Sequence, residues 1–144
     1  MPLEVPVPAK DIYHDCVKNA LIKDGWNITH DPFKLEIGKK DLYIDLGAAQ
    51  LIAATKTEQK IAVEIKSFIG RSDVDDLEKA LGQYVLYFDI LEDFEPERIL
   101  YLAIRLTTFE DLFEEPIGKI LLKKRRMKLI VFEPKKEEIL KWIH

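Results

Sequence analysis

Cysteine is almost missing from this 144-residue sequence, and Cys16 has no second cysteine with which to form an internal disulfide. A lone cysteine is typical of proteins that work in a reducing compartment. Apolar runs of the roughly 18 residues needed for a membrane helix are also missing. The first ten residues hold three prolines and Glu4, which is unlike a secretory signal. These absences predict a cytoplasmic protein with no membrane partner.

A strong positive charge and the usual ligand-binding motifs are missing as well. The net charge is −4, from 22 basic and 26 acidic residues, whereas a protein that coats nucleic acid without sequence preference is basic. The three histidines, His14, His30 and His144, lack zinc-ligand spacing. Glycine-rich phosphate loops are absent too. A metal site built from clustered carboxylates remains compatible with this composition.

Apolar periodicity and turn residues predict an α/β chain with a mixed sheet. Prolines make residues 1–9 an extended lead-in, and residues 10–144 are expected to form a single domain. The predicted helices cover 11–24, 72–91, 109–113, 117–124 and 135–142. The predicted strands cover 26–29, with 35–38 extending that edge, then 42–45, 51–55, 60–66, 99–104 and 129–132.

The strand predicted over 60–66 carries two charges on one face. Side chains alternate along a strand, so Ala62, Glu64 and Lys66 face the side opposite to Ile61 and Ile65. Hydrolysis of a phosphodiester needs a divalent cation to stabilise charge on the phosphate, and Mg²⁺ prefers carboxylate oxygens. Glu64 is therefore a candidate metal ligand, and Lys66 a candidate to orient the attacking water.

A second carboxylate is expected to complete this site. Asp45 precedes the predicted hairpin and reaches the strand next to Glu64 if that hairpin folds back. Asp41 competes with Asp45, although it follows two lysines and suits a loop. The backbone carbonyl of Ile65 is a further candidate ligand. Mg²⁺ or Mn²⁺ is the expected cofactor.

Two other segments offer polar groups. Gln83 and Tyr87 lie one helical turn apart and share a face of the helix over 72–91, where they support the site or form a plain polar stripe. The densest basic run suits phosphate contacts or a solvated helix end. It comprises Lys123, Lys124, Arg125 and Arg126.

The sequence resembles the PD-(D/E)xK nuclease superfamily, in which an acid and a hairpin precede a Glu-x-Lys pair, here Asp45 and then Glu64-x-Lys66. Ile44 stands where the motif has proline. The resemblance implies a restriction-endonuclease-like core in the order αβββαβ, followed here by a strand and a helix. It also implies that Gln83 and Tyr87 help to orient the site. Its first helix often supplies a supporting acid, and His14 and Asp15 both occupy that neighbourhood.

At family level the sequence resembles the XisH family, the fdxN-element excision controlling factors. The resemblance is carried by segments 10–15 (KDIYHD), 20–26 (ALIKDGW), 61–68 (IAVEIKSF), 80–84 (ALGQY) and 115–118 (EPIG) and by the Trp142 end. It implies a role in programmed excision of a DNA element in heterocyst-forming cyanobacteria, beside a second small protein, XisI.

Two functions of different kinds follow from these resemblances. In the first, the chain is a magnesium-dependent deoxyribonuclease whose catalytic residues are Asp45, Glu64 and Lys66. In the second, it keeps the nuclease fold but only binds DNA, a site-specific recombinase or XisI. Nuclease-like folds of this size often pair to meet both DNA strands, so a homodimer is a candidate assembly.

Overall fold

A six-stranded mixed sheet organises the part of the chain that the computed structural model describes, residues 9–144. The lead-in predicted for residues 1–9 falls almost wholly outside these described residues. The strand order is β1-β4-β5-β6-β7-β8, in which β5, β6 and β7 run parallel and the other pairs are antiparallel. The strands are β1 (Asn27–His30), β4 (Leu46–Ile52), β5 (Thr57–Ile65), β6 (Arg98–Arg105), β7 (Leu129–Glu133) and β8 (Glu138–Ile143).

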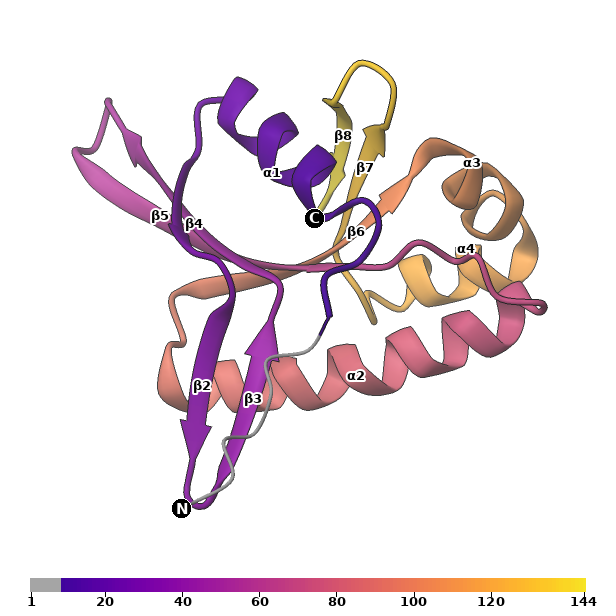
Figure 1. The fold of residues 1–144 in the computed structure, drawn as a ribbon, viewed down its shortest axis with the longest axis horizontal. Coiled ribbons are helices and arrows are strands. Elements are labelled where there is room, and N and C mark those ends of the chain that lie inside the picture. The colour runs from indigo at the N-terminus through magenta and orange to yellow at the C-terminus, as the bar shows by residue number, and fades with distance from the viewer. Residues whose placement is uncertain (1–8) are drawn as a thin grey trace.

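Helices cover both faces of the sheet (Figure 1). On one face, α1 (His14–Lys23) buries Val17 and Leu21 against β5 and β6. On the other face, α2 (Asp73–Phe94) buries Leu77 and Leu91. Three short helical segments lie between β6 and β7: α3 (Leu106–Thr108), η1 (Phe109–Phe113) and α4 (Pro116–Lys123). The sheet is therefore the middle of three layers.

A separate hairpin, β2 (Phe33–Ile37) with β3 (Lys40–Ile44), extends from the sheet on the side of α2 (Figure 1). Its residues Phe33, Leu35 and Ile44 join the apolar core that α2 forms with the sheet. The predicted extension of the first strand over 35–38 is therefore wrong, because these residues pair with β3 instead of with the sheet. This hairpin places Tyr43 and Asp45 beside the end of β5.

The predicted hairpin around the Glu64 strand exists, but its first arm starts earlier than expected. Strand β4 begins at Leu46, whereas the predicted strand began at residue 51, so Gly47 lies inside β4. Glycine suits this strand position because its neighbours pack closely: a Cβ atom on Gly47 would lie 2.9 Å from His30 Nδ1 and 3.0 Å from the Phe33 ring. The turn between the arms covers 53–56 instead of the predicted 56–59.

The helix predicted over 135–142 is wrong, because this segment forms β8, an edge strand antiparallel to β7. A turn after β7 ends at Glu137, whose φ of 51° reverses the chain. Strand β8 then forms hydrogen bonds with the backbone N–H and C=O groups along the outer edge of β7. It also brings the Trp142 ring within 5.6 Å of Trp26 and 5.0 Å of Tyr101, between ring centroids. Trp142 thus packs against the core from a strand and not from a helix.

No helix in the described range 9–144 combines the length and the apolar character that a membrane crossing requires.

Candidate functional site

A cavity of about 210 Å³ lies between α1, the end of β5 and α2. Most of the residues that the sequence singled out for chemistry line it, although they come from four separate elements. The lining residues are Ala9, Lys10, Asp11, His14, Asp31, Pro32, Tyr43, Asp45, Glu64, Ile65, Lys66, Gln83 and Tyr87. Asp41 is not among them, since it lies on β3 and pairs with Lys34 at 3.8 Å. Of the two candidate second carboxylates, the structure brings Asp45 to Glu64.

Asp45 is held at its place by the backbone of the neighbouring strand. It stands between β3 and β4, and the next residue, Leu46, pairs with Val63, which puts Asp45 across from Glu64. The Ile65 amide donates a hydrogen bond of 2.7 Å to Asp45 Oδ2. Asp45, just before β4, and Glu64, on the adjacent strand β5, therefore lie side by side, as the sequence predicted.

Glu64 is a buried carboxyl group, with 6% of the residue exposed. Within residues 9–144 its buried Oε2 atom has no hydrogen-bond partner. Burial, followed by the hydrogen bond and the charge of Asp45, raises the pKa of Glu64 to about 10 from an ordinary 4.5, while the Lys66 charge works in the opposite direction. Two carboxyl groups this close share a proton unless a cation replaces it.

Lys66 follows the last residue of β5 and remains in sheet geometry, because its amide donates to the Ala103 carbonyl at 3.1 Å. The alternation of β5 continues, so Lys66 lines the same cavity as Glu64. The half-buried ammonium group lowers the pKa of Glu64 by its charge. This confirms the predicted common face of Glu64 and Lys66.

Gln83 and Tyr87 reach the cavity from α2. Tyr87 is buried, and burial together with the charges of Glu64 and Asp45 raises its pKa to about 12, while a hydrogen bond with Gln83 opposes that rise. The Tyr87 hydroxyl therefore stays protonated at neutral pH and can donate to a carboxylate. The structure places this pair beside the two acids instead of on an outward polar stripe.

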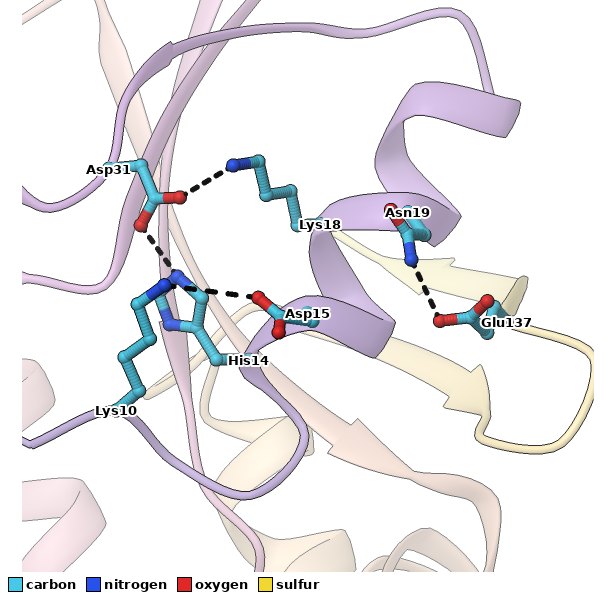
Figure 2. Close-up of polar contacts among 7 residues, drawn as sticks. All are labelled: Lys10, His14, Asp15, Lys18, Asn19, Asp31 and Glu137. Atoms are coloured by element: carbon cyan, nitrogen blue, oxygen red, sulfur yellow. Dashed lines mark hydrogen bonds and ion pairs between the residues drawn. The ribbon is translucent and has the colours of Figure 1, made fainter.

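The first helix supplies His14, not Asp15, to the cavity. His14 is 3% exposed, and its Nε2 atom lies 2.6 Å from Asp31 Oδ1 (Figure 2). Asp15 does not line the cavity: 80% of its side chain is exposed, and its Oδ1 atom lies 3.9 Å from Lys10 Nζ. Asp31 also accepts a hydrogen bond of 2.8 Å from Lys18. Sequence reasoning missed Asp31 because its position before Pro32 only suggested a strand end.

Sequence and structural comparisons agree on the relatives of the chain. Residues 7–140 match the family described as XisH protein. This chain belongs to the XisH family. No curated protein matches the sequence.

Two crystal structures resemble this XisH-family chain over nearly its whole length. One is an XisH family protein from Nostoc punctiforme, with 36% identity, a TM-score of 0.83, and coverage of 93% of this chain and 100% of the other. The second is an fdxN element excision controlling factor protein from Anabaena variabilis, with 38% identity and a TM-score of 0.83. It covers 94% of this chain and 100% of its own.

The polar groups of this XisH-family cavity suit a hard divalent cation. Across the described residues 9–144, no group of three or more His, Cys, Asp and Glu side chains gathers as a ligand cluster. Mg²⁺ needs fewer, because it usually takes one or two carboxylates and completes its shell with water and phosphate oxygens. Asp45, Glu64 and the Ile65 carbonyl could meet that requirement, and within residues 9–144 no hydrogen bond occupies the buried Glu64 Oε2 atom.

The basic run of this XisH-family chain lies apart from the cavity. Lys123 ends α4, and the other three exposed cations follow the helix end, where Arg125 adopts a φ of 53°. None of Lys123, Lys124, Arg125 and Arg126 lines the cavity. Cations at a helix C-terminus interact favourably with the helix dipole. Their predicted role in DNA binding stays a prediction.

Proposed function

We propose that this XisH-family chain carries a divalent-metal-dependent, nuclease-like site that acts on DNA phosphodiester bonds during excision of a DNA element. The observation that carries the proposal is the meeting of Asp45, Glu64 and Lys66 in one cavity, where the buried Glu64 Oε2 atom has no hydrogen-bond partner among the described residues. The name of the Anabaena variabilis relative, an fdxN element excision controlling factor, supports the link to DNA excision.

The arrangement of elements supports a PD-(D/E)xK core for this proposal. Helix α1 precedes the antiparallel pair β4 and β5, and α2 then leads to β6, which runs parallel to β5. The acid stands just before β4, Glu64 and Lys66 stand at the end of β5, and Gln83-x-x-x-Tyr87 follows on α2. The β2–β3 hairpin is then an addition to that core, inserted ahead of the acid.

The residues at the end of β5, on α2 and at Asp45 each have a chemical role under this proposal. Asp45, Glu64 and the Ile65 carbonyl would hold Mg²⁺ or Mn²⁺, and the bound cation supplies electrostatic stabilisation of charge on the phosphate. The Lys66 ammonium group positions the attacking water and offsets part of the same charge. Tyr87 and Gln83 orient the Glu64 carboxylate from α2.

Cleavage of labelled single-stranded, duplex and branched DNA with Mg²⁺ or Mn²⁺ tests the proposal. Wild type should cut at least one substrate, and Glu64→Gln and Lys66→Ala should each lower the rate by about 100-fold or more, as losses of groups in direct contact with the reaction do. Asp41→Asn is the matched control, because Asp41 lies outside the cavity, and it should cut at the wild-type rate. Wild type that cuts none of these substrates would contradict the proposal.

A metal-binding prediction follows without any need for activity. At a free Mg²⁺ or Mn²⁺ concentration about 100 times its dissociation constant, the free energy of unfolding should rise by about 2.7 kcal/mol through binding to the folded state. Thermal unfolding with and without the cation measures this rise. It should vanish in Glu64→Gln and persist in Asp41→Asn, so an equal shift in both variants would place the cation elsewhere.

An accessory role is the second candidate, favoured by the absence of a three-ligand cluster within residues 9–144. Here the chain would bind DNA, a site-specific recombinase or an XisI-like small protein and hydrolyse nothing. Co-purification of an XisI-like protein, or DNA retention in a gel, should then survive both Glu64→Gln and Lys66→Ala. A loss of binding in both variants would argue against a role independent of the cavity.

A further inference from the structure

Three hydrogen-bonded side chains from α1 and the β1–β2 connection form a row, Lys18–Asp31–His14 (Figure 2), of which Asp31 and His14 line the same cavity. Lys18 Nζ lies 2.8 Å from Asp31 Oδ2, and His14 Nε2 lies 2.6 Å from Asp31 Oδ1. Only 16% of the Asp31 side chain and 3% of that of His14 are exposed. The roles proposed for the carboxylates and Lys66 leave this row unused.

Asp31 is suited to fix the hydrogen positions of the His14 ring. Burial opposes its ionisation, but hydrogen bonds from Lys18 and His14 outweigh burial and hold the pKa of Asp31 below its ordinary value. An ionised Asp31 only accepts hydrogen bonds, so His14 must carry a proton on Nε2. In a histidine held in this way, the partner of one ring nitrogen decides the state of the other. Nδ1 therefore becomes the nitrogen that is free to exchange a proton.

His14 Nδ1 is buried and, among residues 9–144, has no hydrogen-bond partner. It lies on the ring edge away from Asp31 (Figure 2). His14 is also not gathered with Asp45 and Glu64 into a ligand cluster. An imidazole that lines a cavity, is oriented by a carboxylate and keeps one nitrogen free has the arrangement of a proton-transfer group.

We propose that His14 is a further catalytic residue, whose protonated Nδ1 donates to the oxygen that leaves phosphorus, and that Asp31 and Lys18 are positioning residues for it. This inference rests on the proposed function. Water attacks phosphorus and releases a proton to solvent, while the bond from phosphorus to the leaving oxygen breaks. That oxygen takes the Nδ1 proton, and His14 regains a proton from solvent.

Nitrogen NMR of the histidine rings in the full chain tests the positioning without any activity. His14→Gln assigns the His14 signals. Above its titration range, His14 should be protonated on Nε2 alone in wild type, and Asp31→Asn should mix the two neutral forms. A thymidine dinucleotide should shift Nδ1 more than Nε2. Protonation on Nδ1 in wild type, or identical spectra in Asp31→Asn, would overturn the positioning role.

Kinetics with two substrates tests the proton transfer. His14→Ala should cut DNA about 100-fold more slowly than wild type, and added imidazole should restore part of the rate. The rate at which His14→Ala hydrolyses bis(4-nitrophenyl) phosphate should differ little from that of wild type, because 4-nitrophenolate departs without a proton. Asp31→Asn should lower kcat and leave KM nearly unchanged. Asp15→Asn, one residue along the same helix and outside the cavity, is the matched control.

The outcomes separate the inference from the proposed function. Wild type that cleaves DNA, together with His14→Ala that slows both substrates equally and ignores imidazole, would overturn the proton transfer and leave the nuclease site intact. Wild type that hydrolyses neither substrate would remove the reaction itself, and the NMR measurement would then decide whether Asp31 orients His14.

Discussion

Glu64→Gln is expected to make the metal-free protein more stable at pH 7 while it removes metal binding. The pKa of the buried carboxyl group is raised from 4.5 to about 10 by burial and by Asp45. At pH 7 the unfolded chain ionises Glu64 and the folded chain does not, which costs the fold about 3 kcal/mol at about 1.4 kcal/mol per pKa unit. Glutamine keeps the shape and has no charge to lose, so this cost disappears.

The dependence on pH makes this prediction specific. A raised pKa means that the folded state retains the Glu64 proton while the unfolded state loses it above pH 4.5, so the contribution of Glu64 to wild-type stability falls as pH rises from there. The gap between Glu64→Gln and wild type should be below about 1 kcal/mol at pH 5 and about 3 kcal/mol at pH 7. Urea unfolding in the presence of a chelator measures both values.

Glu58→Gln is the matched control for this experiment, because Glu58 lies on the same strand but is exposed. It should change stability little at either pH. Equal stability of wild type and Glu64→Gln at pH 7 would mean that burial of the Glu64 carboxyl group does not destabilise the metal-free fold. The expected result would show that the buried Glu64 carboxyl group, a metal ligand under the proposed function, lowers the stability of the metal-free fold at pH 7.

Gly118→Ala is expected to lower the free energy of unfolding by about 3–4 kcal/mol through overpacking. A Cβ atom at this position would lie 2.3 Å from the Leu112 carbonyl oxygen and 2.4 Å from Phe113 Cα. Both contacts are with backbone, which cannot rotate away as a side chain can. Helix α4 would have to separate from η1, whose residues Leu112 and Phe113 belong to the core.

Gly82→Ala makes a control of opposite sign. Gly82 lies within α2, and a Cβ atom there meets nothing within 4 Å. Alanine should therefore stabilise the protein by about 1 kcal/mol through helix propensity alone. Urea unfolding of both variants measures the contrast. If Gly118→Ala were as stable as wild type, α4 and η1 would not be packed as described.

The core of the site could be predicted from the sequence because it depends on strand periodicity. Lys66 comes two residues after Glu64 and continues the geometry of β5, and that spacing fixes a common side whatever the rest of the fold does. Asp45 needed only the hairpin to fold back. Asp31 could not be found in this way, because its contact with His14 joins the β1–β2 connection to α1, and only tertiary packing decides such a contact.

Helical elements show where sequence reasoning fails. On α2 the apolar residues Val85 and Leu86 are about half exposed, whereas Tyr84 and Tyr87 are buried. Apolar residues occur on both sides of α2, so periodicity alone does not select the inner side. For the last segment, hydrogen bonding to the free edge of β7 overrode its helical pattern.

The contact between Trp26 and Trp142 determines what fluorescence can report on this protein. The sequence holds two tryptophans, and both lie in the apolar cluster between α1 and the sheet, where neither lines the cavity. Tryptophan emission should therefore follow the detachment of β8 and the loss of the α1 face during unfolding. Occupancy of the cavity has its own chromophores, Tyr43 and Tyr87. Excitation at wavelengths that tyrosine does not absorb therefore follows unfolding without a contribution from the tyrosines of the cavity.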